Sequence, residues 1–238
     1  HNSWGKKPPG YIDIYKNYLI IINGQADFLF FDLNELNDDK INFDFIDSNF
    51  DNFIDKKKYI LPGITGPRDL EIINDEIFIS YIDKDSCDKV SIAKAKINFN
   101  FLQFEKFYSW DGCVNNELGF NDDKTLLDQR NAGRIRNADD DHIFFTIGNY
   151  YQFSKDKALS QDMDSLFGSI IKINKTNKNY SIISKGHRNQ QGLYFDQKTN
   201  YLLTTEHGPQ GGDELNILNL NDEEIKNFGW PISSYGVH

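Results

Sequence analysis

The sequence predicts an all-β protein, and within that class a β-propeller built from four-stranded blades. Short runs rich in Ile, Phe, Tyr and Leu recur between clusters of Asn, Asp and Gly, while apolar positions at helical spacing are scarce. These runs fall into four groups that share one layout and recur at a nearly constant interval. Such a repeat of strands is typical of propeller blades.

The four groups each contain three or four candidate strands. The first group comprises residues 11–15, 19–22 and 27–31, and the second comprises 69–73, 76–82, 90–97 and 102–108. The third comprises 133–136, 142–147, 168–173 and 180–183, and the fourth comprises 191–195, 201–205 and 213–218. Each run has the length and the β-branched or aromatic content of a strand.

One apolar strand of each group ends on a corner, and these corners set the repeat length. The corners are Ile22-Asn23-Gly24, Ser80-Tyr81-Ile82, Ile147-Gly148-Asn149 and Glu206-His207-Gly208. The interval is 58 residues from Gly24 to Ile82 and 66 from Ile82 to Gly148. It is 60 residues from Gly148 to Gly208. These intervals exceed the ~40–50 residues of common blades, so we expect insertions between strands.

Four units of this length occupy the whole chain, so we expect about four blades in one domain, residues 1–238. Each blade buries its faces only against its neighbours, so a propeller ring must close. The last group reads as an unfinished blade. We therefore expect a fragment, or an open ring that a partner completes. The alternative architecture is an irregular β-sandwich.

Composition and charge exclude several classes of function. The 238 residues are 39% hydrophobic and 26% charged, which is typical of a folded globular chain. The formal net charge of −10 and the lack of a basic stripe argue against a nucleic-acid partner. No apolar run approaches the ~18 residues of a membrane helix. We therefore expect no membrane span.

The two cysteines, Cys87 and Cys113, lack the spacing of a zinc site. In an exported protein they could form a disulfide, and the alternative is two unpaired thiols. We expect no zinc in either case.

Three local motifs carry the chemistry: residues 186–193 (Gly-His-Arg-Asn-Gln-Gln-Gly-Leu), 206–216 and 227–231. In the second motif Gly208-Pro209 makes a rigid turn, and adjacent carbonyl oxygens there suit a hard cation such as Ca²⁺. Asp213 and Glu206 could add negative charge. The alternative is that these residues only turn the chain between two strands.

Arg188, Asn189 and Gln191 combine a planar guanidinium with two amides, a donor set that recognises carboxylate and quinone oxygens. The alternative is a network between blades in which Arg188 satisfies buried carbonyls. Trp110 and Trp230 are predicted to pack between blades.

Together the three motifs resemble the glucose/sorbosone dehydrogenase family, the soluble aldose dehydrogenases that depend on pyrroloquinoline quinone (PQQ). Residues 133–135, 145–149 and 167–173 support the resemblance, which covers residues 66–238. It implies a six-bladed propeller, periplasmic or secreted, in which PQQ and Ca²⁺ occupy the central cleft. The implied reaction oxidises the C1 hydroxyl of a small-molecule sugar to a lactone by hydride transfer.

The resemblance also assigns residues to the cofactors. It implies that PQQ contacts Arg188, Asn189, Gln191, Gly208 and Pro209. The Ca²⁺ ligands would come from three of the motif positions. These are Gly208, Pro209 and Asp213. The remaining PQQ contacts of the family lie in later blades than this chain contains.

The chain departs from the family at the general base. Family members have a histidine four residues before the arginine that is Arg134 here, and this chain has Arg130 at that position. An arginine has no accessible lone pair at neutral pH, whereas a positioned base is worth ~10²–10⁴-fold in rate. None of His142, His187 and His207 replaces the base obviously. The acid of the third-blade corner is also changed, to Asn149.

Three functions remain open from the sequence. The first is a PQQ- and calcium-dependent sugar dehydrogenase. The second is a non-catalytic propeller that binds a carbohydrate, a protein partner or a small anion, the last through Arg130 and Arg134. The third is a calcium-assisted lactonase, for which Asp128, Asp213 and Glu206 supply few carboxylates.

Overall fold

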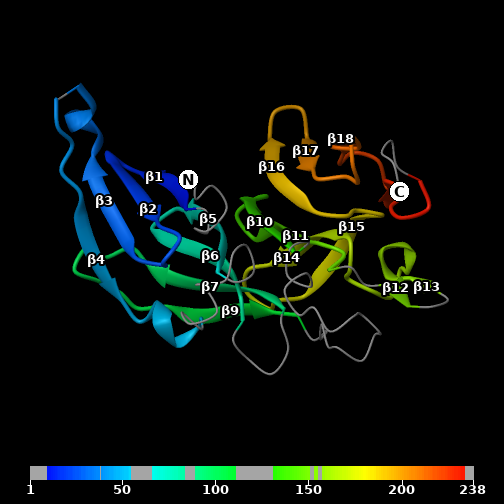
Figure 1. The fold of residues 1–238 in the computed structure, drawn as a ribbon, viewed down its shortest axis with the longest axis horizontal. Helices are drawn as coiled ribbons and strands as arrows, with labels where there is room; N and C mark the ends of the chain where they lie inside the picture. Colours follow the sequence, from blue (N-terminus) through cyan, green and yellow to red (C-terminus); the bar gives the residue numbers. More distant parts are fainter. Residues whose placement is uncertain are drawn as a thin grey trace, which may run out of the picture. The chain divides into compact units, whose positions relative to one another are not determined.

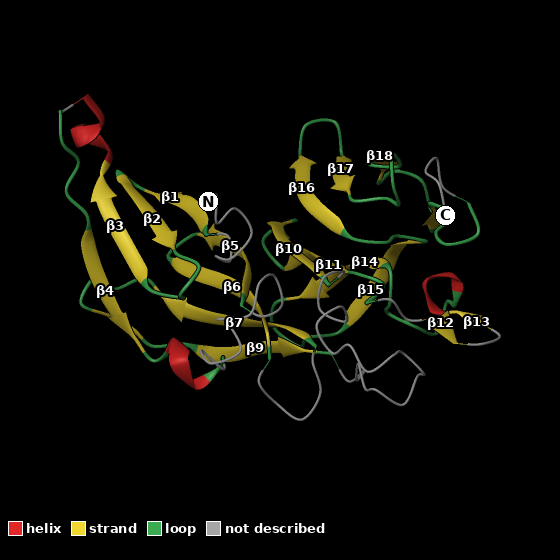
Figure 2. Ribbon diagram, viewed as in Figure 1, coloured by secondary structure: helices red, strands yellow, loops and turns green. Residues whose placement is uncertain are grey.

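Antiparallel β-sheets make up nearly all the regular structure of this protein (Figure 1). The computed structural model describes residues 10–37, 39–54, 66–83, 89–110, 131–150, 153–154 and 157–233. In these ranges the helices are short 3-10 turns only (Figure 2). The chain divides into two units, His1–Asp111 and Gly112–His238.

The first unit contains two sheets. One has the order β1 (Tyr11–Tyr15), β2 (Tyr18–Ile22), β3 (Phe28–Asp32), β4 (Asp44–Ser48), with η1 (Leu33–Asn37) between β3 and β4 and η2 (Phe50–Asn52) after β4. The other has the order β5 (Pro67–Ile73), β6 (Glu76–Ile82), β7 (Val90–Lys96), β9 (Glu105–Ser109). A short strand, β8 (Phe101–Leu102), pairs in parallel with β4 and so links the second sheet to the first.

The prediction of one strand over residues 102–108 was wrong, and Asn49 explains why. Its side chain accepts a hydrogen bond from the Phe104 N–H at 2.6 Å and donates to the Phe104 carbonyl at 3.0 Å. Because Asn49 takes both backbone groups of Phe104, the ladder is interrupted there and the chain passes from one sheet to the other.

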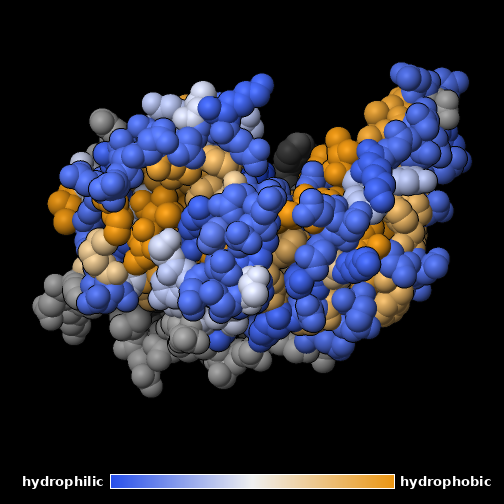
Figure 3. Space-filling view, turned by 180° about the vertical axis from the view of Figure 1, so that it is seen from behind, coloured by the Kyte–Doolittle hydropathy of each residue, from blue (hydrophilic) through white to orange (hydrophobic). Residues whose placement is uncertain are grey.

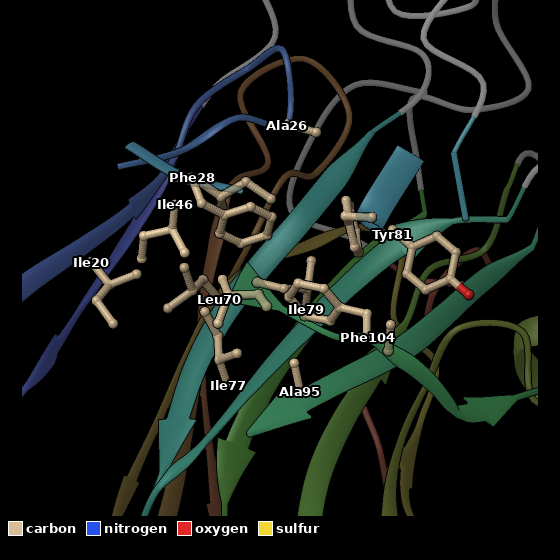
Figure 4. Packing of buried hydrophobic residues seen from close by; sticks show 14 of the residues in the cluster. Ile20, Ala26, Phe28, Ile46, Leu70, Ile77, Ile79, Tyr81, Ala95 and Phe104 are labelled. Carbon is tan, nitrogen blue, oxygen red and sulfur yellow. The ribbon is translucent and has the colours of Figure 1, made fainter. Parts of the chain in front are cut away.

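Side chains at alternate positions of these strands form the core of the first unit (Figure 4). The rings of Phe28, Phe50 and Phe104 contact one another, with centroids 5.7 Å (Phe28–Phe50), 5.2 Å (Phe28–Phe104) and 5.0 Å (Phe50–Phe104) apart. The ring of Tyr81 lies edge-on to Phe50 at 5.6 Å. Aromatic packing thus holds the two sheets together.

The second unit repeats the layout. Its first sheet has the order β10 (Ala132–Asn137), β11 (His142–Ile147), β14 (Ser169–Asn174), β15 (Tyr180–Lys185), with β19 (Lys226–Asn227) parallel to β15. Its second sheet contains β16 (Gln190–Asp196), β17 (Tyr201–Glu206) and β18 (Glu214–Asn219). A two-stranded hairpin, β12 (Phe153–Ser154) and β13 (Lys157–Ala158), precedes η6 (Leu159–Gln161).

The two sheets of the second unit pack through a smaller apolar core. Its fully or nearly fully buried members include Phe144, Ile170, Leu193, Leu202 and Leu218. The cluster draws on both sheets, so each sheet covers an apolar face of the other.

The all-β prediction and the repeat are confirmed. Each predicted corner lies at the end of a strand, namely β2, β6, β11 and β17. The sequence analysis missed β4, because only Ile46 of this Asp- and Ser-flanked strand is buried. Cys87, Cys113, Asp128 and Arg130 lie outside the described residues. In the part described, no helix has the length and hydropathy to cross a membrane.

Apolar side chains also remain on outward faces of both units (Figure 3). Ile12 and Ile14 on β1 are 60% and 55% exposed, and Leu215 and Ile217 on β18 are 62% and 55% exposed. In each strand they alternate with residues turned to the packed face, as the pleat requires. Such faces are of the kind that neighbouring propeller blades cover.

We predict that Phe50→Ala lowers the free energy of unfolding by about 3–5 kcal/mol, because it empties the centre of the aromatic cluster. Urea denaturation followed by circular dichroism measures this. Phe45→Ala is the control, since Phe45 on β4 is 69% exposed and its loss is expected to cost less than about 0.5 kcal/mol. Equal losses would contradict the assignment of the core.

Candidate functional site

The three motifs meet in the second unit, where the chain leaves β15, β17 and β19. The Trp230 N–H donates to the Gly186 carbonyl at 2.9 Å, and the His207 N–H donates to the Asn189 carbonyl at 3.0 Å. Gly186 has φ +74°, and a Cβ there would lie 2.2 Å from Asn227 Oδ1. A side chain at this position would therefore separate the first motif from the third. In Figure 1 the red C-terminal segment lies beside the end of β15.

His187 and Glu206 form a buried pair at this meeting point. The His187 Nδ1 lies 2.8 Å from Glu206 Oε2, and its Nε2 lies 2.8 Å from Ser184 Oγ. Glu206 Oε1 also accepts a hydrogen bond from the backbone N–H of Arg188. Both carboxylate oxygens of Glu206 thus form hydrogen bonds inside the protein. The sequence indicated Glu206 only as a source of negative charge for a cation, so this role was not predicted.

Arg188 joins two of the motifs. Its Nη1 donates to the His207 carbonyl at 2.6 Å, and the guanidinium carbon lies 5.3 Å from the centre of the Trp230 ring. The side chain therefore satisfies a backbone carbonyl, as the network alternative supposed, and also lies over an aromatic face.

Asn189 and Gln191 belong to one hydrogen-bonded chain with Arg134. Asn189 Oδ1 accepts from the Ala132 N–H at 3.2 Å and from Gln191 Nε2 at 2.7 Å. Gln191 Oε1 in turn accepts from Arg134 Nη2 at 3.4 Å. The chain connects β10 to β16, so these amides hold the two sheets together as well as facing the corner.

Gly208, Pro209 and Asp213 form a tight loop after β17. The Gly208 N–H donates to Asp213 Oδ1 at 3.1 Å, and the Gly212 N–H donates to the Pro209 carbonyl at 2.7 Å. A Cβ on Gly208 would lie 1.7 Å from the Gly212 carbonyl oxygen, so only glycine fits. These bonds fold Asp213 back onto Gly208, while the predicted cation site at Gly208, Pro209 and Asp213 stays a prediction.

Asn149 is fully buried and belongs to the framework of this corner. Its backbone N–H donates to the Arg188 carbonyl at 2.9 Å. With the amide oxygen turned toward the indole, the side chain accepts from Trp230 Nε1 at 2.9 Å and donates to the same Arg188 carbonyl at 3.1 Å. Trp230 is thus buried at this corner, 7% exposed, with its indole N–H bonded inside the protein.

The histidines of the described ranges, His142, His187 and His207, occupy three different environments. His187 is sealed in the interior, and His142 begins β11, about 16 Å of extended chain from the corner that follows Ile147. His207 is the described histidine whose ring is open at the corner: its side chain is 60% exposed and its Nδ1 lies 3.5 Å from Asp213 Oδ2.

Lys185, directly before the first motif, was not singled out by sequence. Its Nζ donates to the carbonyls of Ser165 and Phe167 at 2.7 and 2.8 Å, although the residue is fully buried. Burial lowers its pKa from 10.5 to about 8, partly offset by Asp162. No sequence signal reveals it, because its partners lie on a loop about 20 residues earlier.

Comparison with known proteins now identifies the family. The model of the glucose/sorbosone dehydrogenase family matches residues 74–238, which contain all three motifs. The chain belongs to this family. An aldose sugar dehydrogenase of Escherichia coli is 30% identical over 120 residues, a match that covers 45% of this chain and 30% of that protein. An uncharacterized protein of Synechocystis is 50% identical over 52 residues, or 22% of this chain and 12% of that protein.

Solved structures of the same kind share the fold. A glucose dehydrogenase superposes with a TM-score of 0.70 at 17% identity, over 98% of this chain and 66% of that one. The soluble aldose sugar dehydrogenase of E. coli gives a TM-score of 0.68 at 17% identity, over 98% of this chain and 65% of that one. The family member described here thus spans about two thirds of the length of these enzymes.

We predict that the free energy of unfolding rises between about pH 8 and pH 10 through Lys185. Its folded-state pKa lies below the unfolded value of 10.5, so the unfolded chain holds more protons in this window and stability increases with pH. The gain is at most about 3 kcal/mol. Lys185→Met removes this slope in urea denaturation series, whereas Lys226→Met, at an exposed ion pair, keeps it. A slope that survives in Lys185→Met contradicts the assignment.

Proposed function

We propose that this chain is the cofactor-binding part of a PQQ- and calcium-dependent aldose dehydrogenase, periplasmic or secreted, that oxidises the C1 hydroxyl of a sugar to a lactone. The observation that carries the proposal is the convergence of the three family motifs around Arg188 and Gly208. The single-domain organisation over residues 1–238 is part of the same proposal.

The oxygen atoms at the Gly208 loop suit a hard cation. Among the described residues, no three His, Cys, Asp or Glu side chains cluster as a metal site, so a cation would rest mainly on backbone carbonyls. The Pro209 carbonyl uses one lone pair in its turn and keeps a second, and Asp213 is a largely exposed carboxylate. These hard donors fit Ca²⁺ better than a transition metal.

Arg188 supports the quinone half of the proposal. Its planar guanidinium suits a carboxylate, and its bond to the His207 carbonyl places it next to the Gly208 loop. Asn189 and Gln191 add amide groups behind it. Bound PQQ would supply the hydride acceptor, while these residues would fix its orientation against the cation.

Proton removal is the weakest part of the site. Arg130 at the family's base position cannot accept a proton, and His187 is sealed. Among the described histidines, His207 has an exposed ring beside Gly208, so it is the residue we assign as base if the chain oxidises sugars. Arg130 at the base position favours a second function, a propeller that binds ligand without catalysis.

We predict that isothermal titration calorimetry shows saturable PQQ binding that requires Ca²⁺. Arg188→Ala is expected to weaken this binding at least tenfold, because it removes the guanidinium partner of a carboxylate. Binding by the unmodified chain without sugar oxidation, and oxidation restored by Arg130→His, would favour the non-catalytic function. No PQQ binding at all would contradict the proposal.

We also predict that Gly208→Ala abolishes calcium-dependent binding while Gly211→Ala preserves it. The added methyl at Gly208 meets a backbone oxygen, whereas at Gly211 it meets nothing within 4 Å and costs only about 1 kcal/mol of backbone strain at φ +80°. Calcium titration of each folded variant checks this. Loss of binding in both variants, or in neither, would speak against a cation at Gly208.

A further inference from the structure

Ser184, His187 and Glu206 form a buried hydrogen-bonded chain whose proton positions follow from its ends. The Arg188 N–H can only donate, so Glu206 Oε1 accepts. Glu206 Oε2 accepts from Asn216 Nδ2 and, in the same role, from His187 Nδ1–H, which leaves Nε2 to accept from the Ser184 hydroxyl. The imidazole is thereby held in one tautomer.

This order of groups is that of a hydrolase triad, but the structure rules out that chemistry. Ser184 and His187 have no exposed surface, and the Phe228 ring lies 4.8 Å from the imidazole. No substrate carbonyl can reach the Ser184 oxygen, so the chain is not a nucleophile with its base.

The geometry points instead to a role of these three side chains in positioning the groups that bind the ligand. This inference rests on the proposed function. Glu206 ends β17 and directly precedes His207 and Gly208. Its carboxylate holds the Arg188 backbone, while the Arg188 side chain holds the His207 carbonyl. We propose that this closed loop of bonds fixes the guanidinium of Arg188 relative to the carbonyls of Gly208 and Pro209. Glu206, His187 and Ser184 are then positioning residues for the ligand.

Two substitutions at Glu206 separate charge from geometry. Glu206→Ala leaves the N–H groups of Arg188 and His187 without acceptors in a buried site. In Glu206→Gln the amide oxygen can still accept from Arg188, and the amide nitrogen can donate to His187 Nδ1. His187 then takes its other tautomer and donates from Nε2 to Ser184. Asn216 Nδ2 loses its 3.4 Å bond to Glu206 Oε2 but keeps its 3.2 Å bond to Glu214 Oε2.

The test is PQQ affinity with Ca²⁺, measured by calorimetry on variants that circular dichroism shows to be folded. We expect Glu206→Ala to weaken binding at least tenfold and Glu206→Gln less than threefold. Leu202→Ala is the matched control: it destabilises the same strand from the apolar core and should leave affinity within twofold. Equal loss in Glu206→Ala and Leu202→Ala would overturn the positioning role.

Amide hydrogen exchange tests the positioning role of Glu206 without a ligand. Glu206→Ala should speed exchange of the Arg188 and His207 amides at least tenfold relative to those of β11, while Glu206→Gln and Leu202→Ala should not. If the unmodified chain binds no PQQ but this pattern appears, the proposed function fails and the positioning geometry stands; without the pattern, the positioning role fails.

If Glu206→Ala does not fold, Ser184→Ala tests the hydrogen-bonded chain of Ser184, His187 and Glu206 in two backgrounds, the unmodified protein and Glu206→Gln. In Glu206→Gln the His187 Nε2–H needs the Ser184 oxygen as acceptor, so Ser184→Ala should accelerate Arg188 amide exchange more there than in the unmodified chain. Equal effects in the two backgrounds would contradict the proposed switch of tautomer.

Discussion

In the described part of the chain, each of the larger sheets has an apolar face that a second sheet covers. In the first unit Phe28, Phe50 and Phe104 fill the space between two sheets, and in the second Phe144 and Leu202 do the same from facing sheets. A sheet without such a partner would leave this apolar face exposed to water. Face-to-face burial therefore aligns the sheets and brings their corner loops together.

The candidate site follows from that alignment. The loops of this corner are held by backbone bonds, such as Asn149 to Arg188 and Trp230 to Gly186, and by buried polar side chains such as those of Asn149 and Glu206. Satisfied polar networks fix geometry more tightly than apolar contacts do. A loop-built corner of this family can thus be rigid before any ligand binds, which lowers the entropic cost of binding.

Strand runs and corners of the fold were predictable because alternation and turn residues are local signals. β4 was not predicted because a single buried residue, Ile46, gives no alternation of apolar and polar positions. The break in the strand at Phe104 was not predicted because its cause, Asn49, lies 55 residues away in the sequence. At the site, the motifs identified Arg188 and Gly208, whereas the burial of Glu206 and Lys185 depends on long-range contacts that no local pattern encodes.

The central claim, that the three motifs form one preorganised ligand site, is tested most directly by comparing amide hydrogen exchange of the unmodified chain with and without PQQ and Ca²⁺. The account predicts that added protection is confined to residues 186–191, 206–213 and 227–231. Protection that appears only elsewhere, or no change at saturating ligand, would contradict it.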